Sequence, residues 1–174
     1  MNPILPSFNE HGLLPPDDYP FSIDQLRTSH LVTGAGNPST AWDARWRLHL
    51  VNNLEIIVMQ MWEVGLTEIF ADGSFVQDID HPSDIDCYFV CDSKRLDSVL
   101  PLLNANDSDG VWTCDRDRRI PAPPKEPQLP MFIKYGIEMW PHPAMKGDAR
   151  TIFPKYFRQD RETKRPKGIV KIIR

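Results

Sequence analysis

Two acidic residues at alternate positions of a strand-like segment place the strongest constraint on the fold of this chain. The segment is otherwise apolar and carries Asp84 and Asp86. Because successive side chains of a strand point to opposite faces, the two carboxylates share one face, about 6 to 7 Å apart along the chain. The opposite face, expected to be buried, carries Ile85, Cys87 and Phe89. The pattern predicts a sheet with an apolar face and a carboxylate pair on the other face.

This carboxylate pair indicates a metal site. Carboxylates this close repel each other unless a cation lies between them, and hard oxygen ligands suit Mg²⁺ or Mn²⁺ bound together with a substrate phosphate. Gly73 and Ser74 follow an apolar run, residues 66–71, that we expect to be the preceding strand. A glycine lets the backbone approach a phosphate, and Ser74 offers it a hydroxyl and an N–H. We therefore predict a combined metal and phosphate site.

A third acid comes from a later segment with strand alternation, Phe132–Trp140. Its apolar face aligns with that of the Asp84 strand, which would bring Glu138 to the side of Asp84 and Asp86. The alternative for Glu138 is an exposed glutamate on an edge strand. Lys134 is expected on the same face as Glu138, four positions before it. There it would neutralise phosphate charge or pair with Glu138.

At Gly73-Ser74 and Asp84-Ile85-Asp86 the chain resembles the DNA polymerase β-type nucleotidyltransferase superfamily, whose signature is a Gly-Ser turn followed by Asp-x-Asp. More narrowly, it is similar to a small, mostly bacterial family of nucleotidyltransferase-like proteins. These share a Leu-Pro-Pro opening, a central DGSF…P-S/N-D-I-D and a KGIVKI close, found here at residues 14–16, 72–86 and 167–172. The likeness covers almost the whole chain. It implies an α/β (α+β) fold, the minimal nucleotidyltransferase fold, in which helices pack on one face of a mixed β-sheet.

The resemblance also implies an activity, the Mg²⁺-dependent transfer of a nucleoside monophosphate from an NTP such as ATP to a protein or RNA acceptor. Some small relatives act in bacterial toxin–antitoxin or phage-defence pairs. The metal ligands and catalytic residues that it implies are Asp84, Asp86 and Glu138, with Glu138 also taking the proton of the attacking hydroxyl. The residues that would bind the nucleotide are Gly73, Ser74 and Lys134. One segment departs from the pattern: many minimal transferases carry an Arg and a Gly after Gly-Ser, whereas residues 75–78 here are Phe-Val-Gln-Asp.

Two other functions remain open at this point. The first is a catalytically silent member that binds a nucleotide or a partner protein, as an antitoxin or a sensor would. The second is a nucleic-acid-binding module, because the charge is uneven: residues 155–174 hold eight Lys or Arg against two acids, a net +6, so residues 1–154 carry −10 of the total −4. This basic C-terminal segment 155–174 would bind RNA, DNA or nucleotide phosphates, or simply be a solvated segment.

The length and composition favour one domain. The 174 residues, 41% hydrophobic and 25% charged, suffice for a single core at residues 21–174, while five prolines make residues 1–20 an extended arm without regular structure. Three cysteines without CxxC spacing argue against disulfides and zinc, and Cys87 reads as a core residue. The chain lacks a membrane-length apolar run and its start lacks signal-peptide character, so we expect a cytoplasmic protein without membrane contact.

The apolar spacing predicts three helices, at residues 22–31 with Ser22 as N-cap, 40–64 with Thr40 as N-cap, and 94–103. The longest has an apolar stripe formed by Trp46, Leu50, Leu54, Ile57, Met61 and Val64. Arg45 and Arg47 lie off this stripe, where they would be solvated or reach a phosphate. Residues 104–110 are expected to be a loop with solvated acids, and residues 115–130 a long loop, either a lid or disordered. A last strand is expected at residues 167–173.

Overall fold

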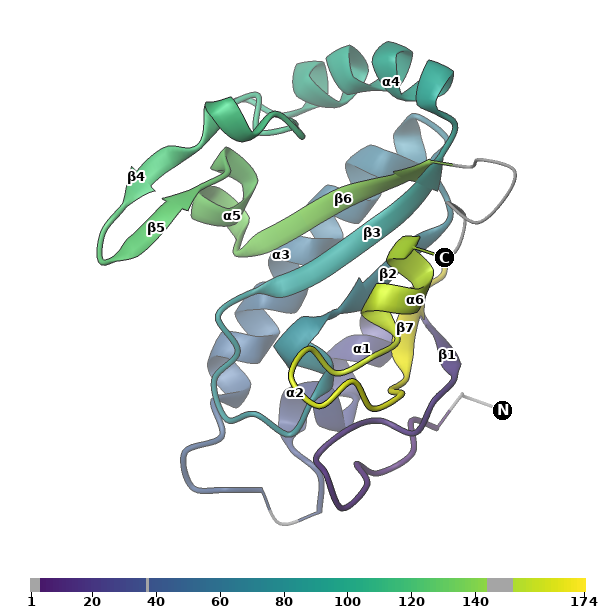
Figure 1. The fold of residues 1–174 in the computed structure, drawn as a ribbon, viewed down its shortest axis with the longest axis vertical. Coiled ribbons are helices and arrows are strands. Elements are labelled where there is room, and N and C mark those ends of the chain that lie inside the picture. The colour runs from purple at the N-terminus through teal and green to yellow at the C-terminus, as the bar shows by residue number, and fades with distance from the viewer. Residues whose placement is uncertain (1–3, 37, 144–151) are drawn as a thin grey trace.

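The structure is a computed structural model that describes residues 4–36, 38–143 and 152–174. Its centre is a five-stranded mixed sheet in the order β1-β7-β2-β3-β6 (Figure 1). The strands are β1 (Asp18–Phe21), β2 (Ile69–Asp72), β3 (Ile85–Cys91), β6 (Ile137–Pro143) and β7 (Ile169–Ile172). The pairs β1–β7 and β3–β6 are parallel, and β2 is antiparallel to both of its neighbours. The predicted α+β fold with a mixed sheet is confirmed.

The main core lies between one face of the sheet and the helices α1 (Ile23–Thr28), α2 (His30–Thr33), α3 (Ala44–Glu63), α4 (Ser93–Asn106) and α5 (Pro130–Tyr135). The predicted stripe of α3 supplies four fully buried side chains, Leu50, Leu54, Ile57 and Met61. The helix begins later than expected because Asp43, rather than Thr40, accepts the hydrogen bond of the Trp46 N–H. Ser22 is the N-cap of α1, as predicted, and forms a capping box with Gln25. The expected single helix divides at Ser29 into α1 and α2.

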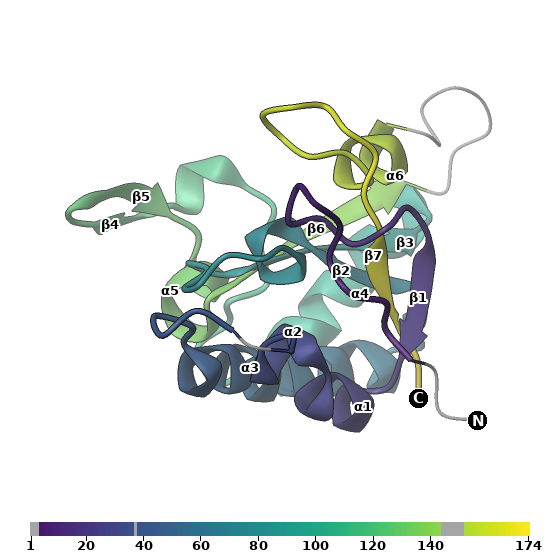
Figure 2. The same ribbon diagram turned by 90° about the horizontal axis from the view of Figure 1, so that it is seen from below.

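The opposite face of the sheet carries a smaller apolar cluster, formed by Phe70, Tyr88, Phe157 and Ile169. Its cover is α6 (Ile152–Phe157), which lies across the sheet from α1 and α3 (Figure 2). This short helix is an exception to the expected arrangement, in which helices cover one face only. The rest of this second face remains available for polar side chains.

The N-terminal segment is built into the domain. Leu5, Leu13 and Leu14 are buried in it, and its end forms β1, which pairs with β7. The expectation of an arm without regular structure is therefore wrong from Asp18 onward, because the exposed edge of β7 provides unpaired backbone groups that an extended chain satisfies. The prolines before Asp18 leave residues 4–17 without a helix or strand.

The segment from residue 115 to residue 143 differs most from expectation. The anticipated long loop contains a 3₁₀ turn, η2 (Arg116–Arg118), and a hairpin of β4 (Ile120–Ala122) and β5 (Lys125–Gln128). The expected strand over 132–140 is a helix, α5, followed by β6. Pro130 suits the first turn of α5, and Gly136 ends it in the left-handed conformation with φ 65°.

Among the described residues, no helix has both the length and the apolar character needed to cross a membrane.

Candidate metal centre

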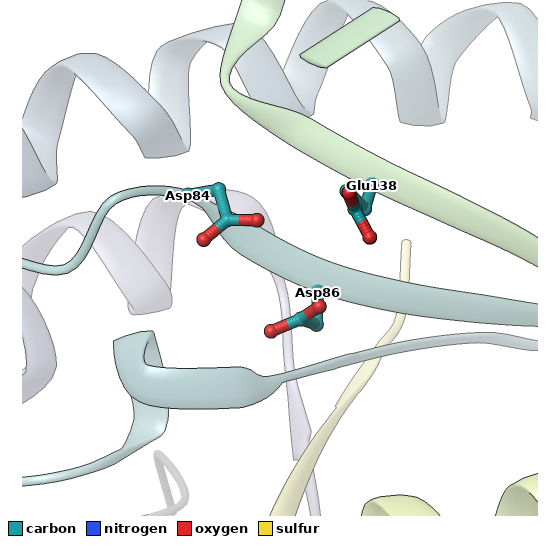
Figure 3. A group of neighbouring side chains, drawn as sticks. All are labelled: Asp84, Asp86 and Glu138. Atoms are coloured by element: carbon teal, nitrogen blue, oxygen red, sulfur yellow. The ribbon is translucent and has the colours of Figure 1, made fainter. Parts of the chain in front are cut away.

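Three carboxylates meet on the second face of the sheet. Asp84 immediately precedes β3, Asp86 lies in β3, and Glu138 is the register partner of Asp86 on the parallel strand β6. One oxygen from each lies within 4.8 Å of the other two (Figure 3). The structure thus brings together the three acids that the sequence selected, with Asp84 and Asp86 on one face. The opposite face of β3 buries Ile85, Cys87 and Phe89, as expected.

The electrostatics of this cluster favour a cation. Burial raises the pKa of Asp86 to about 7, and the nearby charges of Asp84, Glu138 and Asp72 act in the same direction. A carboxyl group with such a pKa ionises at a cost near neutral pH, and a cation in contact with it would remove that cost. Asp84 is fixed by the Ser83 hydroxyl, which donates to its Oδ1 at 2.6 Å.

Gly73 makes space for the cluster. It opens the 3₁₀ turn η1 (Gly73–Val76) with φ 75°, and a Cβ at this position would lie 2.0 Å from Oδ2 of Asp86. Any other residue would therefore displace the Asp86 carboxylate as well as strain the backbone. The sequence argument assigned Gly73 to a phosphate contact; the structure shows that its lack of a side chain also accommodates Asp86. Ser74 follows it in the same turn and lines the same cleft.

A buried ion pair continues the row of charges across the sheet, and sequence reasoning missed it. Asp72 is the register partner of Asp86 on β2, and Lys167 places its Nζ 3.0 Å from Oδ1 of Asp72. Both side chains are buried. Burial raises the pKa of Asp72 to about 6, although the Lys167 charge acts to lower it. Strand alternation was the available signal, because residues two positions apart point to the same face. Asp72 lies two residues after Phe70, and Lys167 lies two residues before Ile169.

These charges form the floor of a cleft of about 750 Å³. Its walls include Glu126 and Gln128 of the β4–β5 hairpin, Phe132 of α5 and Tyr156 of α6. The acids among its described lining residues are Asp72, Asp84, Asp86, Glu126, Glu138, Asp160 and Glu162, and the bases are Lys167 and Arg161. With all of them ionised, seven negative charges face two positive ones. Such a cleft attracts cations and repels free anions.

Lys134 lies outside this cleft, contrary to the prediction. It belongs to α5, and its Nζ pairs with Oδ1 of Asp107 at 3.0 Å and Oδ2 of Asp109 at 2.9 Å. The prediction failed because the strand alternation assumed for residues 132–136 does not exist in a helix. Asp107, expected to be solvated, is buried and accepts a hydrogen bond from the Tyr135 hydroxyl at 2.7 Å.

Arg47 has a role that sequence reasoning missed. It is fully buried on α3, and its guanidinium donates to the backbone carbonyls of Leu31, Phe75, Gln77 and Ile79. Three of these carbonyls belong to the connection between the Gly-Ser turn and Asp84. Arg47 is therefore neither solvated nor placed on a phosphate; it holds the segment that joins the two halves of the site.

Three cations of the basic C-terminal segment contact the domain itself. Lys167 is buried against Asp72, Arg158 pairs with Asp18 and donates to the Tyr88 hydroxyl, and the Arg174 guanidinium donates to the Trp62 carbonyl. These three side chains neutralise or cap groups of the domain itself. The structure thus provides a local use for part of the positive charge.

The comparison with protein families covers the whole site. A model of one family matches residues 6–173. The chain belongs to DUF6932, a family of unknown function. The matched range contains the three carboxylates, the Gly-Ser turn and Lys167, so all the elements of the cleft floor lie within the part of the chain that corresponds to DUF6932. No curated protein and no solved structure matches the chain.

Proposed function

We propose that this protein is a Mg²⁺-dependent nucleotidyltransferase that moves a nucleoside monophosphate from an NTP to a hydroxyl group of a protein or RNA acceptor. The observation that carries the proposal is the convergence of Asp84, Asp86 and Glu138 beside the Gly73-Ser74 turn, in one cleft. Glu138 is distant in sequence from the other four residues, and all five are of the types that the resemblance to the polymerase β-type superfamily implies.

The three carboxylates fit a hard divalent cation. Their oxygens lie close enough to share one ion, and carboxylate ligands suit Mg²⁺ or Mn²⁺. Gly73 leaves the space that the Asp86 carboxylate occupies, and the raised pKa of Asp86 shows that this group is ionised at a cost in the protein alone. When bound, the metal would offset charge on the reacting phosphate and lower the pKa of the attacking hydroxyl.

The residues of the chain would divide the work of an in-line displacement. Ser74 offers a hydroxyl and an N–H to the phosphates, and Glu138 accepts the proton of the acceptor hydroxyl. The hydroxyl oxygen bonds to the α-phosphorus while the bond from that phosphorus to the bridging oxygen breaks, and pyrophosphate leaves with the electron pair. Catalysis of this kind depends mainly on positioning and charge neutralisation. Arg47 contributes indirectly, because it fixes residues 75–79 between the turn and the acids.

Incubation of the protein with Mg²⁺ and each α-³²P-labelled NTP, with total protein and RNA extracts as acceptors, tests the proposal. We expect label on a macromolecule and release of pyrophosphate, both lost in Asp86→Asn and Glu138→Gln. The matched control is Asp97→Asn, which removes an exposed acid of α4 and is expected to retain activity. Transfer that survives Asp86→Asn would overturn the proposal, and nucleotide binding without transfer would favour the silent binding member.

A further inference from the structure

Lys167 stands out among the groups of the cleft that the proposed function has not used. It is one of two basic side chains in the described lining, and the other, Arg161, is exposed. The Nζ of Lys167 lies 3.2 Å from the carbonyl oxygen of Gly73, so it is in contact with the turn that carries Ser74. A cation is thus built into the place where the phosphates of a nucleotide would lie.

The charges follow a fixed order across the sheet. Glu138 on β6 pairs in register with Asp86 on β3, Asp86 pairs with Asp72 on β2, and Lys167 precedes β7 and contacts Asp72. The candidate metal ligands therefore lie at one end of the row and the cation at the other. A polyphosphate whose first phosphate lies near the carboxylates would extend its remaining phosphates past the Gly-Ser turn toward Lys167.

The ammonium group retains a hydrogen for an incoming ligand. A lysine ammonium has three donors, and the described residues give Nζ of Lys167 one hydrogen-bond acceptor, Gly73 O, and an ion-pair contact with Asp72 Oδ1 at 3.0 Å. Stability alone does not account for such a pair, because burying two charges costs desolvation that well-packed apolar residues would avoid. Asp72 and Gly73 instead hold the lysine in place at the floor of the cleft.

We propose that Lys167 binds the terminal phosphates of the nucleotide and takes the role that the sequence had suggested for Lys134. This inference rests on the proposed function, since it names the group that receives the polyphosphate in the same cleft. Residues 75–80, which follow the Gly-Ser turn, contain no basic side chain. The contribution of a cation therefore comes from the C-terminal segment instead of from the turn.

Binding of inorganic tripolyphosphate in the presence of Mn²⁺, measured by calorimetry on the full chain, tests the inference. Loss of one charge-assisted contact predicts that Lys167→Met weakens tripolyphosphate binding by about 10- to 100-fold. Its affinity for Mn²⁺ alone should be unchanged or higher, because a positive charge near the carboxylates has been removed. The matched control is Lys171→Met, which removes a lysine of β7 that lies over the Phe70 ring outside the cleft.

The following outcomes decide the matter. Wild-type affinity for tripolyphosphate in Lys167→Met, or an equal loss in Lys171→Met, overturns the inference. If Lys167→Met does not fold, the pair Asp72→Asn with Lys167→Met removes both charges and is expected to fold and to show the same loss; wild-type affinity in that pair also overturns it. Asp86→Asn separates the two proposals. Unchanged Mn²⁺ binding in Asp86→Asn refutes the metal centre. Loss of Mn²⁺ binding in Asp86→Asn together with wild-type tripolyphosphate affinity in Lys167→Met refutes only the role of Lys167.

Discussion

Replacement of Asp86 by Asn is expected to stabilise the metal-free protein at pH 8. Asp86 has a pKa of about 7, against an ordinary value of 3.8, so the folded state holds its proton more tightly than the unfolded state does. Between pH 3.8 and about pH 7 the folded state binds more protons than the unfolded state, so the free energy of unfolding falls as the pH rises. The difference of about three pKa units corresponds to about 4 kcal/mol of folding free energy at pH 8.

Melting curves in EDTA measure this effect. For a chain of this size 1 kcal/mol shifts Tm by roughly 2 to 4 °C, so Asp86→Asn should raise the Tm at pH 8 by up to roughly 8 to 16 °C. Well below pH 3.8 the wild-type carboxyl is protonated in both states, and the advantage of the variant should disappear. Asparagine keeps the shape of the side chain against Gly73, which limits any effect of packing.

Addition of Mn²⁺ should narrow the difference between the two proteins. Wild type should gain stability as RT ln(1 + [L]/Kd), about 2.7 kcal/mol at a hundredfold excess over Kd, whereas Asp86→Asn should gain little. Asp97→Asn serves as control, with a wild-type response to pH and to Mn²⁺. A Tm of Asp86→Asn below that of wild type at pH 8 in EDTA would refute the reasoning, because it would show that the carboxylate is a structural partner.

Three further substitutions test other parts of the site. Gly73→Ala combines a positive φ with a Cβ placed 2.0 Å from Asp86, so thermal shift should show a lower Tm and no response to Mn²⁺. Arg47→Met removes the side-chain donor shared by four backbone carbonyls and should lower the free energy of unfolding in urea by more than about 3 kcal/mol, while the exposed Arg45→Met should have no effect. Lys134→Met should leave Mn²⁺ binding and nucleotide transfer unchanged, because Lys134 contacts Asp107 and Asp109; a loss of transfer would restore the role first predicted for it.

Local patterns were sufficient to predict the elements that carry the carboxylates. Alternation identified β3 and the face of Asp86, and spacing of three and four residues identified α3 with its buried stripe. The Glu138 prediction reached the right position although the strand assigned to it began too early. Only its second half, from Ile137, is a strand, and the alternation from there to Trp140 is what determines the direction of Glu138.

The errors arose where a residue interacts with a distant segment. Pro130 and Gly136 were local signals for the start and end of α5, and weighing them above alternation would have removed Lys134 from the site. Arg47 has no such signal, because its partners are backbone carbonyls up to 32 residues away. The contact of Lys167 with Gly73 spans 94 residues. Alternation indicates the face on which Lys167 lies, but neither segment alone identifies Gly73 as its partner.

Under the proposed function, the charges of the cleft favour joint binding of the metal and the nucleotide. Seven acids are present among the described lining residues, and the two bases, Lys167 and Arg161, offset only part of their charge. A polyphosphate alone therefore meets net repulsion. A divalent cation on the carboxylates removes part of the repulsion, and the polyphosphate in turn adds negative charge that favours the cation. By linkage, each ligand must then increase the affinity for the other by the same factor. Lys167 adds to this coupling from the opposite end of the row, since it opposes a free cation while it favours a cation that arrives with its polyphosphate.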